Sequence, residues 1–299
     1  MPPTTADLEP RTQAWVDDAL PPGHAVTRVS TLRGGWTSRI CRLDVEGPDG
    51  PYALVLRSFQ TPFFVRHAPN LLAREADILR LLADTDVPAA RLVAVDPAGD
   101  HCDHPSLLMT LLKGRVDLTE DHSPELARRL VRIHAITPTT RPRTYQPWTD
   151  PDRVRPPGGD DALWRRAISE IRRDPPPYEG AFLHRDFHPG NVLFTGGTIT
   201  GVVDWVETSW GPTDLDVAHC ATATALLHGA EAGMRFADHY RDTGGTLDAD
   251  PAAHRYWRLL DALAFAPAAE KVVGPWRELG RTDIDAAARL TSYVEALLS

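Results

Sequence analysis

The chain has 299 residues and a mass of 32.9 kDa, enough for one large domain or two lobes with a sizeable core. Its 42% hydrophobic and 24% charged residues are typical of a globular protein, and no apolar run approaches the roughly 20 residues that cross a bilayer. The formal charge of −9 and the pI near 5.7 disfavour a nucleic-acid partner, because phosphate backbones attract basic surfaces. They give only weak support for a cationic substrate.

The beginning of the chain and its cysteines predict a cytoplasmic protein. The first seven residues lack the basic and apolar regions of a secretory signal. Cys41, Cys102 and Cys220 lie far apart and form no metal-type pair, so reduced thiols are expected. Neither a membrane nor a nucleic acid is an expected partner.

Alternation of apolar and polar residues predicts a sheet in the first third of the chain. Five short runs have the composition of strands: 26–32, 39–45, 52–56, 92–95 and 107–112. Glycines at Gly34 and Gly35 supply turn chemistry between the first two. Apolar residues at helical spacing predict one amphipathic helix over 71–82. A five-stranded sheet interrupted by one helix is therefore expected between residues 20 and 112.

Beyond Gly114 the pattern becomes helical. Ser123 followed by Pro124 gives one helix a cap residue and a first-position proline. A second helix is expected over 161–173, and three or four more between Thr213 and Leu298. One short β-rich segment, 182–205, lies between these helices and carries the polar residues that matter most.

This segment has the side chains that phosphoryl transfer requires. The reaction needs a carboxylate that accepts a hydrogen bond from the attacking hydroxyl, and oxygen ligands for a metal ion that clamps the phosphates. Asp186 and Asn191 stand in the D-x-x-x-x-N spacing of kinase catalytic loops, and Asp204 follows. Asp186 is therefore the candidate catalytic base. Asn191 and Asp204 are the candidate ligands of Mg²⁺, which prefers hard oxygen atoms.

A hairpin would bring the two candidate metal ligands together. Asn191 and Asp204 face one another across antiparallel strands if the turn centres between Gly197 and Thr198. Gly196 and Gly197 lie beside that point, and glycine tolerates the positive φ of hairpin turns. We therefore expect the amide and the carboxylate to meet at the base of one hairpin, within reach of the catalytic loop.

The block from His184 to Asn191, followed by Val203-Asp204-Trp205, resembles the catalytic and metal-binding motifs of the aminoglycoside phosphotransferase family. That family is a branch of the protein-kinase-like fold. The resemblance implies an α+β bilobal fold with a five-stranded antiparallel N-lobe sheet, one helix and a mainly helical C-lobe. It implies nucleotide binding by residues 1–112 and catalysis and substrate binding by residues 113–299. Arg185 departs from the family, which usually has glycine there.

Three further residues are expected to support the catalytic loop. The block Gly211–Ala218 resembles the next motif of the family, whose aspartate steadies the loop, and that role falls on Asp216. His188 would either hold the loop through a hydrogen bond or touch the substrate, and His184 is expected to be structural.

The resemblance extends to nucleotide-binding residues in the first third. Gly34, Gly35 and Ser38 occupy the turn that closes over the phosphates in kinase-like folds. Arg57 stands where the family holds a phosphate-binding lysine, and Glu75 matches the glutamate that pairs with it. Arginine can bind phosphate and pair bidentately with a carboxylate, so this substitution is compatible with the role.

The segment joining the lobes is expected to hold the base of the nucleotide. Pro105 to Gly114 resembles the family's connecting strand, and the backbone at Thr110 and Leu112 would take the adenine edge.

The sequence thus favours a Mg²⁺-dependent kinase that transfers the γ-phosphate of ATP or GTP to a hydroxyl of a small molecule. An aminoglycoside-like antibiotic is one candidate acceptor, which would make antibiotic resistance the role; choline-like, sugar-amine and amino-acid-derived compounds are others. Arg57 in place of lysine would also fit a catalytically silent nucleotide-binding module. A metal-dependent hydrolase built on His184, Asp186 and His188 is a third reading, although no second His/Asp cluster supplies its remaining ligands.

Overall fold

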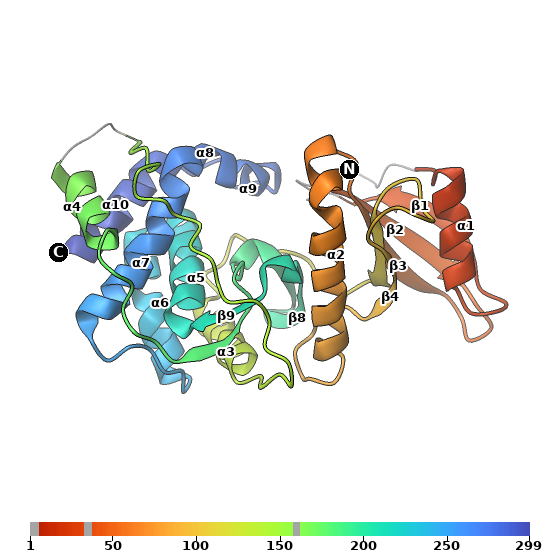
Figure 1. Ribbon diagram of the computed structural model, residues 1–299, viewed down its shortest axis with the longest axis horizontal. Helices are drawn as coiled ribbons and strands as arrows, with labels where there is room; N and C mark the ends of the chain where they lie inside the picture. Colours follow the sequence, from red (N-terminus) through yellow and green to blue (C-terminus); the bar gives the residue numbers. More distant parts are fainter. Residues whose placement is uncertain (1–5, 33–37, 158–161) are drawn as a thin grey trace. The chain divides into compact units, whose positions relative to one another are not determined.

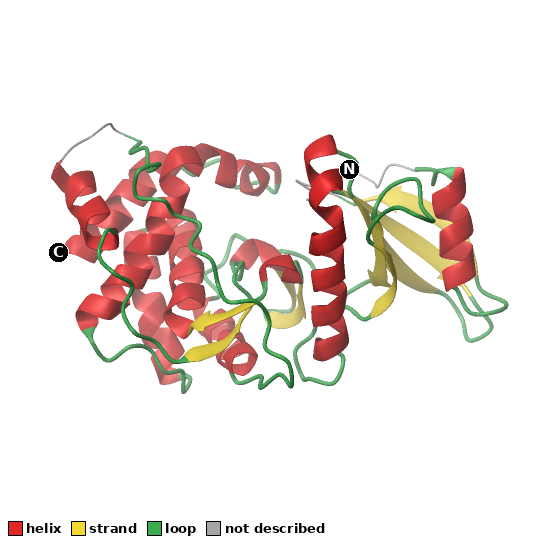
Figure 2. Cartoon of the chain, in the orientation of Figure 1, coloured by secondary structure: helices red, strands yellow, loops and turns green. Residues whose placement is uncertain are grey.

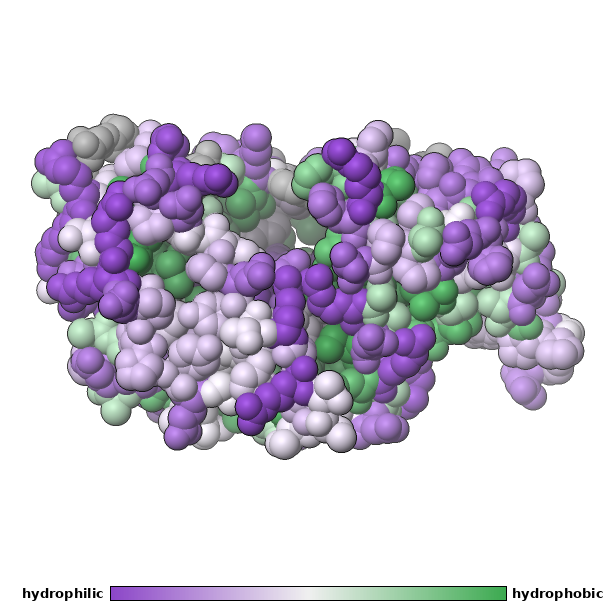
Figure 3. Space-filling model, viewed as in Figure 1, coloured by the Kyte–Doolittle hydropathy of each residue, from purple (hydrophilic) through white to green (hydrophobic). Residues whose placement is uncertain are grey.

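The computed structural model describes residues 6–32, 38–157 and 162–299. The chain forms two compact units, residues 1–113 and 114–299, each of which is described by itself below (Figures 1 and 2). Polar side chains cover most of the visible face of both units, and apolar side chains show there as small separated patches (Figure 3). Among the described helices, none combines the length and apolar character needed to cross a membrane.

The first unit is built on one antiparallel sheet with the strand order β1-β2-β3-β5-β4. Its strands are β1 (Ala25–Thr31), β2 (Arg39–Glu46), β3 (Tyr52–Ser58), β4 (Leu92–Asp96) and β5 (Ser106–Thr110). Side chains of β3 alternate between the two faces. Leu54 and Leu56 join a buried core with Val16 of helix α1 (Pro10–Ala19), whereas Arg57 reaches Glu75 of helix α2 (Pro62–Leu82). The two helices therefore lie on opposite faces of the sheet (Figure 1).

The sheet and the helix between its third and fourth strands confirm the predicted fold of this unit, but the helix bounds differ. α2 begins at Pro62 instead of Leu71. Its first turns carry no clear apolar stripe, since Phe63 is 55% exposed, and Pro69 stands inside the helix. α1 was not expected, because only two of its ten residues are buried and so it lacks the periodicity that marks a helix.

The second unit is mainly helical, as predicted. Its helices are α3 (Ser123–His134), α4 (Ala162–Ile171), α5 (Thr213–His228), α6 (Ala230–Asp242), α7 (Pro251–Phe265), α8 (Ala269–Val272), α9 (Gly274–Glu278) and α10 (Ala286–Leu298). Two antiparallel pairs of short strands accompany them: β6 (Gly180–Leu183) with β9 (Ser209–Pro212), and β7 (Val192–Thr195) with β8 (Thr198–Val202). All residues of α5 from Asp214 to Leu227 are buried, so this helix forms the centre of the unit.

Two sequence predictions for this unit need adjustment. The three or four helices expected after Thr213 correspond to α5, α6, α7 and α10, while α8 and α9 are additional helices of only 4 and 5 residues. The predicted cap at Ser123 was wrong. The cap position is His122, and the Ser123 side chain bonds to Asp121 rather than to the first turn of α3.

Candidate active site

The loop that follows β6 is fixed by one buried carboxylate. Asp216, in the first turn of α5, is fully buried and accepts two backbone hydrogen bonds, from His184 N and Arg185 N, both at 2.8 Å. His134 lies against the same carboxylate, with Nε2 at 3.2 Å from Oδ2. Burial opposes ionisation of Asp216, but the hydrogen bond from His134 and the positive charges around the carboxylate together outweigh burial and lower the pKa. The structure thus places Asp216 where it can steady the loop.

Both histidines of the loop make local hydrogen bonds. His184 is fully buried; its Nδ1 accepts the Asp186 N–H at 3.2 Å, and its Nε2 lies 3.0 Å from the Val203 carbonyl. His188 accepts the Gly190 N–H at Nδ1, at 3.0 Å. Burial lowers the pKa of His184, and it lowers the pKa of His188 to about 4. Both rings are therefore neutral near pH 7, with the proton on Nε2.

Asp186 is held from both sides and still reaches solvent. Its Oδ2 accepts a hydrogen bond from Asn191 Nδ2 at 3.0 Å, and its Oδ1 lies 3.1 Å from His219 Nε2. The side chain keeps 29% exposure. Burial opposes ionisation, but the hydrogen bond from His219 and the nearby His188 outweigh it and hold the pKa of Asp186 well below its usual range. The geometry therefore presents an ionised, oriented carboxylate.

His219 is the residue that the sequence analysis missed. Its Nδ1 lies 3.0 Å from Asp261 Oδ1. The imidazole of His219, which belongs to α5, therefore bridges the carboxylates of Asp186 and Asp261. Burial acts to lower the pKa of His219, but Asp261 and the hydrogen bond to Asp186 outweigh burial and raise it to about 10. One signal could have found it: Asp216 and His219 are three residues apart on one face of a helix. Nothing in the sequence, however, links it to Asp261 in α7.

Arg185 adds a second buried cation beside Asp186, His219 and Asp261. It is 2% exposed, and its Nη1 lies 3.9 Å from Asp261 Oδ1. Its guanidinium carbon stands 4.0 Å from the centre of the Trp148 ring. Asp261 also accepts a hydrogen bond from Thr222 Oγ1 at 2.8 Å. Two cations and a hydroxyl therefore surround the buried Asp261 carboxylate, as is usual for an acidic side chain inside a protein.

The hairpin expected to join the metal-ligand candidates has a different register. The turn residues are Gly196 and Gly197, both at positive φ, so the turn centres one residue before the predicted point. A bulge at Thr200, opposite the step from Leu193 to Phe194, then moves the position facing Asn191 from Val202 to Val203. As a result the Asn191 carbonyl accepts the N–H of Val203 rather than facing Asp204. The prediction of a direct Asn191–Asp204 pairing was therefore wrong by one residue. Asp204 lies just past the strand in a left-handed conformation, with φ 63°.

The oxygen atoms of Asn191 and Asp204 suit a hard metal ion. Asn191 uses its amide nitrogen on the Asp186 carbonyl and carboxylate, at 2.9 and 3.0 Å, which leaves its amide oxygen as the coordinating end. With the Asp204 carboxylate it offers the oxygen ligands that Mg²⁺ prefers.

The histidines suit a metal poorly. Asp186, His188 and His219 bring their ligand atoms within 4.8 Å of one another. Yet His219 bonds carboxylates at both nitrogens, and the Nδ1 lone pair of His188 is occupied by Gly190. Both nitrogens of His184 are likewise engaged. The hydrolase reading therefore lacks the nitrogen ligands it requires.

The first unit brings together the residues expected at the nucleotide phosphates. Arg57 Nη1 lies 3.1 and 3.0 Å from the two oxygens of Glu75, and Arg57 Nε donates to Ser38 Oγ at 3.1 Å. The side chains of Arg57 and Glu75 are only 9% and 2% exposed, so Arg57 is no ordinary surface arginine. Gly34 and Gly35 lie outside the described residues.

The connecting strand limits how the backbone could bind a base. β5 ends at Thr110, two residues before the predicted end, and the Thr110 N–H donates to the Arg91 carbonyl at 2.9 Å. Only the carbonyl of Thr110 and the backbone of Leu112 therefore stay as candidates for the adenine edge.

Comparison with known proteins shows the family to which the chain belongs. The model of the phosphotransferase enzyme family matches residues 28–260, and the chain therefore belongs to this family of enzymes. No curated protein sequence matches the chain.

Solved structures share the fold over nearly the whole chain. A candidate aminoglycoside phosphotransferase from Ralstonia eutropha JMP134 is 17% identical, with 95% of this chain and 97% of that chain covered and a TM-score of 0.64. A thermostable mutant of aminoglycoside phosphotransferase APH(4)-Ia, bound to ADP and hygromycin B, is 18% identical over 92% and 94%, with a TM-score of 0.59. Amicoumacin kinase in complex with AMP-PNP, Ca²⁺ and Ami is 13% identical over 95% and 93%, also at 0.59. These likenesses confirm the protein-kinase-like fold.

The raised pKa of His219 predicts a pH-dependent contribution to stability. In the folded chain the pKa is about 10, above the ordinary 6.5, so the folded state binds this proton more tightly than the unfolded state. The stabilisation should be complete below pH 6.5 and should decline as the pH rises towards 10. Chemical unfolding of the parent and of His219→Gln should therefore differ most near pH 6.5 and progressively less at pH 8 and 10. A difference that stays constant over this range would contradict the bridging imidazolium.

The buried Arg57–Glu75 pair predicts that single and double substitutions behave differently. Arg57→Met removes the cation that pairs with the buried Glu75 carboxylate and should lower the free energy of unfolding by about 3–5 kcal/mol. Arg57→Met combined with Glu75→Leu should recover most of that loss, while Arg57→Lys should keep both stability and nucleotide binding. Unfolding by denaturant and nucleotide titration of the three variants separate the two roles. If the stable double variant binds nucleotide like the parent, Arg57 has no phosphate role.

Proposed function

We propose that the chain is a Mg²⁺-dependent kinase that transfers the γ-phosphate of ATP or GTP to a hydroxyl group of a small molecule. The observation that carries the proposal is the solvent-accessible Asp186 carboxylate, held by Asn191 on one oxygen and by His219 on the other. Membership of the phosphotransferase family supports the reaction class. Structural neighbours bound to ADP and to AMP-PNP support a nucleotide as the donor.

In this proposal Asp186 orients the acceptor hydroxyl and takes its proton. The acceptor oxygen forms a bond to the γ-phosphorus while the bond from phosphorus to the bridging oxygen breaks, releasing the nucleoside diphosphate. Because this transition state is loose, the carboxylate contributes mainly through its position and charge. His219 and Asn191 supply the position, since each fixes one of the two carboxylate oxygens.

Asn191 and Asp204 would hold the metal ion through an amide oxygen and a carboxylate. When bound, Mg²⁺ would neutralise charge on the nucleotide phosphates. Arg57, oriented by Glu75 and Ser38, would contribute a fixed positive charge for a phosphate oxygen.

The acceptor is a small-molecule alcohol whose identity a turnover assay must decide. Hygromycin B and Ami are bound by structural neighbours, so aminoglycoside-like and related antibiotics come first in a panel. Choline-like and sugar-amine metabolites form the second group.

A silent nucleotide-binding module is the competing hypothesis, motivated by Arg57 in place of lysine. The joint presence of Asp186, Asn191 and Asp204 favours the active kinase. Transfer of labelled γ-phosphate from the nucleotide to any acceptor would exclude the silent module.

The proposal predicts that Asp186→Asn and Asp204→Asn fail in different ways. Asp186→Asn nearly preserves shape, so nucleotide affinity should stay parental while kcat falls by a factor of about 10² or more. Asp204→Asn should weaken Mg²⁺-dependent nucleotide binding as well as kcat. Calorimetric nucleotide titration with and without a chelator, together with kcat on the best acceptor, distinguishes them. Near-parental turnover by Asp186→Asn would remove the catalytic assignment and leave the silent module.

A further inference from the structure

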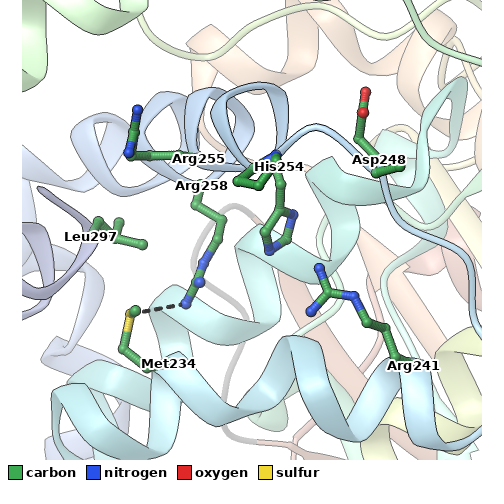
Figure 4. Close-up of a pocket in the computed structure, with 9 residues that line it drawn as sticks. Met234, Arg241, Asp248, His254, Arg255, Arg258 and Leu297 are labelled. Atoms are coloured by element: carbon green, nitrogen blue, oxygen red, sulfur yellow. Dashed lines mark hydrogen bonds between the residues drawn. The ribbon is translucent and has the colours of Figure 1, made fainter. Parts of the chain in front are cut away.

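A pocket of about 230 Å³ opens between helices of the second unit, apart from the candidate active site. It lies against the first turns of α7 and is completed by residues from α6, α10 and the segment before α7 (Figure 4). None of the residues that contact Asp186 lines it. The volume is many times the roughly 10–15 Å³ that a single water needs, so the pocket can admit a small ligand.

Positive charge dominates the lining. Three arginines, Arg241, Arg255 and Arg258, line the pocket, against one acidic residue, Asp248. Arg241 is exposed and shares one nitrogen with Asp238 at 3.2 Å. Figure 4 shows Arg241, His254 and Arg258 pointing into the same space from α6 and α7. This concentration of cations in one concave site favours an anion.

Arg258 is the least expected member, because it is a buried cation whose partners are neutral. It is 6% exposed. Nε and Nη2 bond to the Tyr293 hydroxyl at 3.3 and 3.1 Å, and Nη2 also reaches the Gly233 carbonyl and the Met234 sulfur. Within the described ranges, no carboxylate pairs with Arg258, and the hydrogen-bond partners of its guanidinium are all uncharged. A buried charge normally has a counter-ion, and here the pocket is the place for one.

His254 provides a second unsatisfied group. It is 8% exposed, and its Nδ1 is 2.6 Å from Asp214 Oδ1. Its Nε2 is buried and has no hydrogen-bond partner among the described residues. When Nδ1–H donates to Asp214, Nε2 is an acceptor in the neutral ring and a donor in the charged ring. A ligand that can both donate and accept would satisfy Nε2 in either form.

We propose that this pocket binds the phosphate group of a small metabolite, at a site separate from the proposed phosphoryl-transfer centre. Phosphate offers several oxygens to arginine donors, which bind it in charge-assisted pairs. Protonated phosphate also carries a hydroxyl that can donate to Nε2 of His254, which a carboxylate cannot do. These two features select phosphate over a simple dicarboxylate.

The test is binding of inorganic phosphate to the full chain, without nucleotide and with a chelator present, at an ionic strength held constant with chloride. The melting temperature should rise with phosphate and saturate, because a ligand that binds only the folded state stabilises it. Succinate at the same concentration should have a much smaller effect. A response to phosphate no larger than that to chloride, or a stronger response to succinate, would overturn the proposal.

Two arginines of α6 provide a matched pair of variants. Arg241 lines the pocket, whereas Arg235 does not; both are exposed and each pairs with an acid of its own helix. Arg241→Gln should weaken phosphate binding by about tenfold or more, the value of one charge-assisted hydrogen bond. Arg235→Gln should bind like the parent. The Arg57→Met, Glu75→Leu double variant, which lacks the proposed phosphate-binding cation of the first unit, should also bind like the parent, and this result would exclude the proposed nucleotide site as the source. A parental phosphate affinity in Arg241→Gln would refute the site.

Arg258→Met tests the buried cation directly. It keeps the side chain long and apolar while removing the unpaired charge, so the phosphate response should disappear. If this variant does not fold, the Arg241→Gln and Arg235→Gln comparison decides alone. The outcome is independent of any acceptor or turnover, so failure here and failure of the proposed kinase activity are separate results.

Discussion

The candidate active site depends on a carboxylate that solvent does not reach. Asp216 accepts the backbone N–H groups of His184 and Arg185, and it can do so because α5 is buried all round and cannot move without disturbing the centre of the unit. Two hydrogen bonds to a charged acceptor are each worth more than ordinary ones. They fix the chain at the residues just before Asp186, and Asn191 and His219 then need only orient its side chain.

Arg185 shows how that constraint and a departure from the family pattern fit together. Its backbone has φ 77°, in the left-handed region that favours glycine, which agrees with the glycine usual there in the family. A longer side chain at this position carries a backbone cost of order 1–3 kcal/mol. The side chain offsets this cost through its contacts with the ring of Trp148 and with the nearby Asp261.

What the sequence could predict was local, and what it missed was long-range. The spacing of Asp186 and Asn191 identified the loop, and strand alternation identified the sheet. By contrast, His219 meets Asp186 and Asp261 only after three separate segments fold together, and no short pattern records that. The hairpin prediction erred by one residue, because the turn centres one residue earlier than predicted and a bulge recovers only half of the resulting register shift.

The His219 bridge also bears on how a weak base could serve the proposed reaction. A cation against Asp186 lowers the proton affinity of its carboxylate, which would harm an enzyme that must remove the proton early. In a loose transition state, however, the bond to the leaving oxygen is largely broken before the new bond forms. The acceptor hydroxyl becomes acidic only late, as it bonds to phosphorus. Until then the carboxylate must stay ionised and oriented, which is the state that His219 and Asn191 stabilise.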